Sequence, residues 1–271
     1  MKQLKFLMIV FTLMMGVSFT SCLDDNGGGN STYDAFGYMR TRTYMGTYYF
    51  YDLVGNTYYP TSTSLEEMKK SGFEMSSSTD LVFVYFKYVD TTSTDTKATG
   101  STQTPQTYTI DLVGIASIDS YDAKIMNTVE DMENMVTENA PVVTLEPTDN
   151  YGTYKPGLYG NEMLIIPVAW KMADKKEALS QHTMNLVYVA DEVSENSKEL
   201  VFYLRHDRGT DEKAEVATYR NKAYRIEYIL ENFKEKTGNY PTKITIKAKI
   251  GNDMTLPKEY TNYSIENIEW K

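Results

Sequence analysis

The feature that most constrains this chain is a series of short β-favouring runs, each closed by turn-forming residues. Tyr, Val, Ile and Thr dominate the runs, and Gly, Asn, Pro or Asp separates one run from the next. Branched and aromatic side chains are favoured in strands, whereas the separating residues are favoured in turns. The pattern predicts an all-β protein, in which 23 tyrosines against two tryptophans make tyrosine the characteristic aromatic residue.

The first β region, residues 34–118, begins with a hairpin signal. Strands predicted over residues 48–54 and 57–59 flank Gly55-Asn56, a dipeptide of the kind that forms tight turns. We therefore expect these two strands to pair with each other.

A short helix and two further strands complete this region. Ser64 and Glu67 fit a capping box, which predicts a helix over residues 65–71. The run 81–89 is apolar on both faces, as expected for a strand buried in a barrel or sandwich, and residues 107–118 form another strand.

Residues 119–150 allow two interpretations. Four apolar residues between positions 125 and 136 have helical spacing, which favours a short helix. Pro141 and the acidic content fit a connector equally well. We expect an interdomain segment that contains, at most, one short helix.

From residue 151 onward, strand signals recur at regular intervals. Residues 243–250 alternate without a break, with Lys and Thr on one face and Ile and Ala on the other. A half-buried strand needs this period of two. Strands are predicted over 162–170, 183–190, 200–206, 224–230, 243–250 and 263–270. Strands this frequent, separated by turn signals, predict an antiparallel β-sandwich over residues 151–271.

The N-terminal segment, residues 1–21, has the composition of a secretory signal peptide. Lys2 and Lys5 come first, and an apolar run over residues 6–17 follows them. The run is shorter than the roughly 20 residues that a bilayer-spanning helix needs, and it ends in small residues. We expect this segment to be cleaved.

The single cysteine, Cys22, follows this segment directly. Ser21-Cys22 resembles the end of a bacterial lipobox, which implies cleavage before Cys22 and acylation of that residue. Several acyl chains are needed for durable anchoring, and a cysteine at a new N-terminus can carry them. Asp24-Asp25 resembles the acidic export tag of Bacteroidota surface lipoproteins; the alternative is an acidic tether that selects no leaflet. Residues 22–33 are then a flexible tether, and we expect an outer-membrane protein anchored by lipid and exposed at the cell surface.

Cysteine usage and charge exclude several classes of function. Once Cys22 is acylated, the chain has no thiol for a disulfide, a zinc-thiolate site or a cysteine nucleophile. Two of the 27 basic residues and none of the 37 acidic residues lie in the signal segment, so the remaining chain has a net charge of −12. A negative surface repels phosphate backbones, and we therefore expect no nucleic-acid partner.

Several features together resemble the NigD-like lipoprotein family of Bacteroidota. They are the lipobox with its acidic follower, an opening strand at Gly37-Tyr38, the hairpin YYFYDLVGNTYYP at residues 48–60, and the long β-rich tail. The resemblance implies an OB-type β-barrel domain over residues 34–118, followed by a C-terminal β-sandwich. The family takes its name from genes beside a bacteriocin locus, which makes self-protection one candidate function.

The sequence carries none of the common enzyme motifs: no G-x-S-x-G elbow, no H-E-x-x-H, no P-loop and no dinucleotide fingerprint. His182 and His206 lie on separate predicted strands. One hypothesis makes His206 a general base oriented by Asp207, but neighbours on a strand point to opposite faces. We expect His206 to be hydrogen-bonded locally instead. Residues 207–212 and 149–150 offer oxygen ligands without the EF-hand spacing, so no metal site, cofactor or catalytic residue is expected.

The hairpin tyrosines are the strongest candidates for a contact surface. A buried ring removes about 150–250 Å² from water, so some of them must fill the barrel core. Those left outside would form a platform for a sugar ring or a protein partner. The candidates are Tyr48, Tyr49, Tyr51, Tyr58 and Tyr59. Trp170 and Trp270 are expected in the sandwich core.

Residues 90–106 are rich in Ser and Thr and predict an exposed loop, because they cannot bury themselves. Within it, Asp90-Thr91-Thr92 resembles an O-glycosylation site of Bacteroidota. Thr91 is therefore a candidate for modification.

Three classes of function remain. The first is a non-enzymatic binding or assembly module that presents its β domains to a protein or a surface glycan. The second is bacteriocin-associated self-protection, and the third is a hydrolase of unrecognised type. We expect the first, since no catalytic constellation is recognisable and the fold class alone does not decide between roles.

Overall fold

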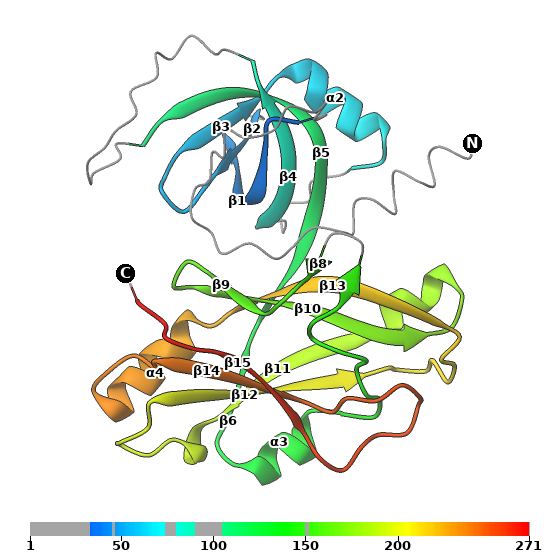
Figure 1. The fold of residues 1–271 in the computed structure, drawn as a ribbon, viewed down its shortest axis with the longest axis vertical. Helices are drawn as coiled ribbons and strands as arrows, with labels where there is room; N and C mark the ends of the chain where they lie inside the picture. The colour runs from blue at the N-terminus through cyan, green and yellow to red at the C-terminus, as the bar shows by residue number, and fades with distance from the viewer. Residues whose placement is uncertain (1–32, 45–46, 74–79, 90–104, 150–151, 271) are drawn as a thin grey trace. The chain divides into compact units, whose positions relative to one another are not determined.

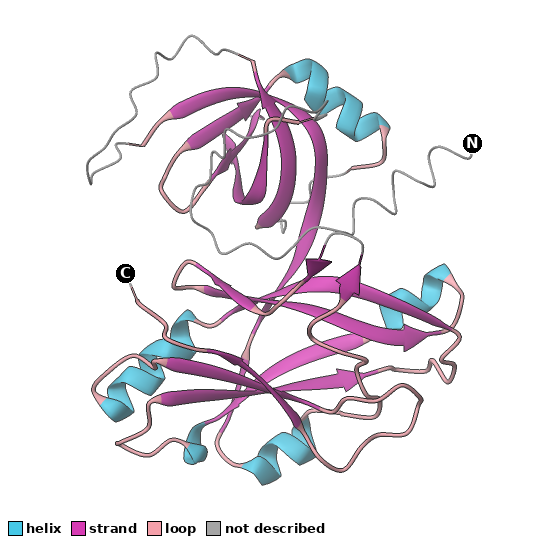
Figure 2. Cartoon of the chain, viewed as in Figure 1, coloured by secondary structure: helices cyan, strands magenta, loops and turns pink. Residues whose placement is uncertain are grey.

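The computed structural model describes residues 33–44, 47–73, 80–89, 105–149 and 152–270 (Figure 1). Strands dominate the described residues and helices are few (Figure 2), which confirms the all-β class. The chain divides between Ser120 and Tyr121 into two compact units, each with its own apolar core.

The first unit is a closed five-stranded barrel, as predicted for an OB-like domain. Its strands are β1 (Ala35–Tyr44), β2 (Thr47–Tyr51), β3 (Thr57–Pro60), β4 (Leu81–Tyr88) and β5 (Thr107–Asp122), the last of which ends in the second unit. They follow the order β3-β2-β1-β4-β5 through antiparallel pairings. A parallel pairing of β3 with β5 closes the barrel.

The predicted hairpin joins β2 and β3. Gly55 takes a φ of 91°, a left-handed conformation that favours glycine. The Asp52 carboxylate accepts hydrogen bonds from the backbone N–H groups of Val54 and Asn56, at 2.9 Å each, and holds the turn closed. Phe50 and Tyr58 then face each other across the pair and enter the barrel core.

The helix after this hairpin, α2 (Ser62–Lys70), begins three residues earlier than the predicted 65–71. Thr61 is its N-cap, and the Thr61 hydroxyl accepts a hydrogen bond from the N–H of Ser64. The predicted capping box at Ser64 is therefore wrong, because Ser64 lies buried inside the first turn. Leu65 and Met68 of α2 pack against the barrel core.

The second unit contains two sheets. One is antiparallel and consists of β9 (Gly157–Tyr159), β10 (Met163–Met172) and β13 (Val216–Arg225). The other has the order β15-β14-β12-β11-β6, with β6 (Lys124–Met126), β11 (Thr183–Val189), β12 (Glu199–Asp207), β14 (Lys243–Ala248) and β15 (Thr261–Ile265). A two-stranded ribbon pairs β7 (Thr148–Asp149) with β8 (Gly152–Thr153). The predicted strands 162–170, 183–190, 200–206, 243–250 and 263–270 correspond to β10, β11, β12, β14 and β15.

The larger sheet is mixed and not purely antiparallel as predicted for the sandwich. β12 pairs in parallel with β14, and β11 pairs in parallel with β6. The chain leaves β12, crosses to the other sheet as β13, and returns through the helix α4 (Glu227–Thr237). After such a crossover, β14 enters the sheet in the same direction as β12.

The inner faces of both sheets and one side of α4 share a single apolar core. Its largest fully buried side chains are Trp170, Tyr188, Phe202, Tyr224 and Phe233. Trp270 packs at the edge of this core, and its Nε1 donates a hydrogen bond to the Pro241 carbonyl at 2.6 Å. Both tryptophans thus take part in the sandwich core.

The predicted strand 224–230 is wrong: β13 ends at Arg225 and α4 follows at once. Ile226, Ile229, Leu230 and Phe233 are all buried, and their spacing of three and four is helical. Gly238 ends the helix with a φ of 77°.

Of the connector expected over residues 119–150, the described residues from Tyr121 onward belong to the second unit. They supply β6 and the helix α3 (Val129–Met135), which begins with a capping box formed by Thr128 and Asp131. Met132 and Val136 of this segment are buried in a small apolar cluster with residues of β11 and β12.

Candidate functional site

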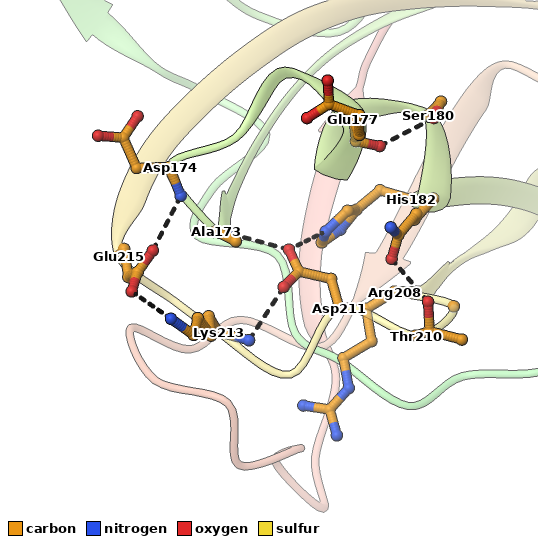
Figure 3. Close-up of polar contacts among 12 residues, drawn as sticks. Ala173, Asp174, Glu177, Ser180, His182, Arg208, Thr210, Asp211, Lys213 and Glu215 are labelled. Carbon is orange, nitrogen blue, oxygen red and sulfur yellow. Dashed lines mark hydrogen bonds and ion pairs between the residues drawn. The ribbon is translucent and has the colours of Figure 1, made fainter.

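A buried pair of histidines lies at one end of the larger sheet in the second unit. His206 is in β12, opposite Met184 of β11, and His182 precedes Met184 by two residues. This register brings the rings together, with His182 Nδ1 2.7 Å from His206 Nε2. His182 Nε2 lies 3.0 Å from the Asp211 carboxylate (Figure 3).

The local bonding expected for His206 is wrong, since its partners come from distant segments. Besides His182, the Pro141 carbonyl lies 2.8 Å from His206 Nδ1. Asp207 points away and accepts hydrogen bonds from Asn139 Nδ2 and the N–H of Gly209. Asp207 therefore does not orient His206, in agreement with the alternation of side chains along a strand.

The proton positions follow from the chemistry of each partner. A carbonyl only accepts, so His206 Nδ1 donates to Pro141. Burial lowers the pKa of His206 to about 4, which leaves this ring neutral at pH 7 with a lone pair on Nε2. His182 Nδ1 must then donate to His206 Nε2.

Asp211 fixes the other proton of His182. Burial works against ionisation of this carboxyl, but hydrogen bonds from His182 and from the N–H groups of Ala173 and Lys213 lower the pKa of Asp211 overall. The resulting carboxylate only accepts, so His182 Nε2 donates to it. Both nitrogens of His182 therefore face hydrogen-bond acceptors, His206 Nε2 on one side and the Asp211 carboxylate on the other.

This cluster acts as a clamp. Side chains of both histidines and of Asp211 are nearly inaccessible to solvent, with exposures of 7, 2 and 6% for the whole residues. Asp211 ties the loop after β12 to Ala173 after β10, and Glu215 beside it accepts from the N–H of Asp174 (Figure 3). The described hydrogen-bond partners of the two imidazoles are each other, Asp211 and a backbone carbonyl, and none of these is a hydroxyl or a thiol.

A second group of buried charges links α3 to the outer face of the same sheet. The Arg205 guanidinium binds Glu133 at 2.9 Å and lies 3.7 Å from Glu138. Lys249 also pairs with Glu138, at 2.9 Å, and Tyr260 donates to the same carboxylate at 3.0 Å. Each buried charge has a partner of opposite charge, as burial requires. This group therefore stabilises the packing of α3 on the sheet.

The candidate tyrosines of the first unit separate into three environments. Tyr58 is buried in the barrel core, where its hydroxyl donates to Asp52 at 2.9 Å and its ring stacks on Tyr108. The prediction that Tyr58 contributes a contact surface is therefore corrected. Tyr48 points to the same side of β2 as Phe50, and its ring lies 5.7 Å from the Lys69 ammonium of α2.

The remaining tyrosines lie together on the outside of the barrel. Tyr49 and Tyr59 stack across neighbouring strands with ring centroids 5.6 Å apart, and Tyr59 is 41% exposed. The Arg42 guanidinium lies 5.1 Å from the centroid of the Tyr51 ring. Contact with the hydroxyls of Tyr51 and Tyr49 raises the pKa of Arg42, so its charge is permanent. We call Arg42, Tyr49, Tyr51 and Tyr59 the tyrosine patch.

The other predicted site residues lie outside the described residues. They are Cys22, Asp24, Asp25 and Thr91, together with the signal segment and the tether. Among the residues that are described, no three His, Cys, Asp or Glu side chains are placed to hold a metal ion. The described helices are all too short or too polar to cross a membrane.

Sequence reasoning placed three tyrosines of the patch but missed Arg42 and the histidine pair. Arg42 could have been found from the sequence, because side chains alternate between the two faces of β1 and this alternation places Arg42 on the outward face. The pairing of His182 with His206 had no sequence signal, since it depends on the register of β11 against β12 and on a loop that returns Asp211 to the strand end.

Comparison with solved structures identifies proteins of the same fold. A putative lipoprotein from Bacteroides fragilis is similar with a TM-score of 0.66 and 23% identity, over 86% of this chain and 98% of that chain. A protein of unknown function from Bacteroides vulgatus has a TM-score of 0.54 and 8% identity, over 87% and 94%. A NigD-like immunity protein from Bacteroides caccae has a TM-score of 0.50 and 13% identity, over 84% and 91%.

At these identities the likeness establishes a shared fold. The neighbours include a NigD-like immunity protein and a putative lipoprotein, which confirms at the level of fold the resemblance predicted from the sequence. No protein-family model matches the chain, and the search of curated proteins finds no match.

Proposed function

We propose that this protein is a lipid-anchored protein of the bacterial cell envelope that binds a partner and catalyses no reaction. The anchor is Cys22, acylated after removal of residues 1–21, and Asp24-Asp25 directs the protein to the outer face of the outer membrane. The lipoprotein name carried by a structural neighbour of the same fold supports this assignment.

The observation that carries the binding role is the tyrosine patch. Its rings are held against one another and against Arg42, yet they remain at the surface of the barrel. Aromatic and arginine side chains of this kind are enriched where proteins bind partners. By contrast, the histidines that an enzyme would use are occupied in a buried clamp.

The binding role is tested with the chain that begins after Cys22, presented to an array of envelope glycans and envelope proteins. The double variant Tyr49→Ala/Tyr59→Ala should lose at least tenfold in affinity for whatever the wild-type chain captures. Tyr228→Ala is the matched control, because Tyr228 is 76% exposed on α4, in the other unit. Equal binding by wild type and the double variant would refute a role for the patch.

Self-protection against a bacteriocin is a second candidate, favoured by the shared fold with a NigD-like immunity protein. On this hypothesis, deletion of the gene sensitises cells to a toxin secreted by neighbouring strains, and the wild-type gene restores survival. If the deletion does not change survival against toxin-producing neighbours, self-protection is refuted and the binding role is unaffected.

A further inference from the structure

The tyrosine patch belongs to one continuous outer face that crosses four strands. Residues of the barrel core, such as Phe50 and Tyr58, point inward, so their neighbours along each strand point outward. The register places Arg42 opposite Tyr49, Tyr51 opposite Thr57, and Tyr59 beside Thr109 of β5. The face thus presents aromatic rings, a row of hydroxyl groups and a guanidinium.

Arg42 differs from Arg40, the other arginine of β1, in its partner. Arg40, the preceding outward residue of β1, binds the Asp80 carboxylate at 3.0 Å through one guanidinium nitrogen. The described contacts of Arg42 are with the aromatic residues Tyr51 and Tyr49 only. Its charge is thus uncompensated among the described residues, in a chain whose net charge is −10.

A guanidinium held over a ring still offers its N–H edge to an anion. The planar fork of arginine matches a carboxylate through two parallel hydrogen bonds. A charge fixed in place by neighbouring rings needs less ordering when a ligand arrives, which favours binding. Arg42 is therefore suited to a single carboxylate.

The surroundings of Arg42 suit a sugar ring that bears this carboxylate. A pyranose has an apolar face, which packs on the exposed ring of Tyr59, and a rim of hydroxyls. The hydroxyls of Tyr49, Thr57 and Thr109 donate and accept hydrogen bonds with such a rim. One cation does not neutralise a polyphosphate in a negatively charged protein, which disfavours nucleic acid.

We infer that the tyrosine patch is a subsite for an acidic sugar, with Arg42 binding the carboxylate and Tyr59 the ring. This inference rests on the binding role proposed above and assigns its ligand class. The ligand is a uronic-acid-type glycan, and a patch that binds only a protein would show itself by the absence of binding to any acidic glycan, which overturns the inference.

The test uses gel retardation and calorimetry with polygalacturonate, alginate and hyaluronan as acidic probes, and with galactan and dextran as neutral ones. Wild type should be retarded by at least one acidic probe, and methyl-esterification of polygalacturonate should remove the effect on that probe. Arg42→Gln should weaken binding of the acidic glycan at least tenfold. Tyr59→Ala should also weaken this binding and should not create binding of neutral glycans.

Arg220→Gln is the matched control, because Arg220 is an exposed arginine of the other unit. Equal thermal midpoints of Arg42→Gln and wild type exclude a folding defect at this surface position. Two results overturn the inference: binding of acidic glycans that Arg42→Gln leaves unchanged, or no binding of any acidic probe. The binding role itself fails only if Tyr49→Ala/Tyr59→Ala retains every partner captured in the array, so the two failures are distinguishable.

Discussion

The His206 ring is hydrogen-bonded to His182 on one side and to the Pro141 carbonyl on the other. His206 stays neutral because burial removes water that would stabilise its charge. Because the pKa of His206 is lowered in the folded protein, the free energy of unfolding depends on the solution pH.

The clamp makes the second unit sensitive to acid. Between pH 6.5 and 4 an unfolded His206 binds a proton that the folded one, with a pKa of about 4, does not. Because the unfolded state binds more protons here, stability falls as the pH falls through this interval, by about 3 kcal/mol at most. The lowered pKa of Asp211 adds a loss in the same direction, at lower pH.

The measurement is chemical unfolding of wild type and His206→Gln between pH 7.5 and 4, followed by tryptophan fluorescence, since Trp170 and Trp270 both lie in the second unit. The difference in unfolding free energy between the two proteins should narrow as the pH falls. A constant difference across the interval would contradict the neutral state of His206.

The sequence could be used to locate aromatic side chains but not to divide them fully into core and surface. Side chains alternate along a strand, so Tyr58 and Tyr59 must lie on opposite faces of β3. Which of the two faces the core is decided by the neighbouring strand, where the buried Phe50 lies opposite Tyr58. The ring of Tyr58 stacks on Tyr108, and its hydroxyl donates a hydrogen bond to Asp52. Both partners come from other segments. Contacts between segments are the part that a local pattern does not contain.

At the scale of elements, strands were easier to predict than helix boundaries. The apolar run 81–89 gives β4, because a strand buried on both faces needs no alternation. Residues 224–230 also contain Tyr, Ile and Leu, at positions 224, 226, 228 and 230. The buried residues follow a helical period instead: they are Ile226, Ile229, Leu230 and Phe233. The alternation of apolar residues at 224, 226, 228 and 230 fits a strand, and α4 was missed for this reason.

The helix α2 provides an element-scale prediction. Thr61→Ala should destabilise the first unit by about 1 kcal/mol, because its hydroxyl caps the helix at the N–H of Ser64. The same hydroxyl donates to Asp111 of β5, so the loss also loosens the helix from the barrel. Far-ultraviolet circular dichroism during thermal unfolding measures the effect.

Thr63→Ala is the control for this change, because Thr63 is exposed inside the same helix. Its substitution should change stability by less than about 0.5 kcal/mol. Equal effects of the two substitutions would show that Thr61 is not the N-cap in solution.

At the scale of the whole molecule, the anchor proposed at Cys22 would hold two folded units at a membrane. We predict that Cys22→Ala abolishes metabolic labelling with a fatty acid and releases the protein from the membrane fraction. A single residue has this effect because the acyl chains are the proposed anchor, at about 0.8 kcal/mol for each buried methylene. Retention in the membrane fraction without acyl label would refute the anchor.

Asp24→Ala/Asp25→Ala is the companion variant, because it leaves Cys22 in place. It should remain acylated and membrane-bound but become protected from protease added to intact cells, whereas wild type is cleaved. Cleavage of both proteins would remove the export role from these two acids, and protection of both would place the protein on the periplasmic side.

The parallel pairings of the second unit have a consequence for how quickly it folds. Lys124 of β6 pairs beside Val187 of β11, and Leu200 of β12 pairs beside Ile244 of β14 after β13 and α4 have been traversed. Each such pairing closes a long loop, and the loss of chain entropy precedes the favourable contacts that offset it. Folding rates fall as contacts become less local, so this unit should fold slowly, and its first strand must wait for residues made much later.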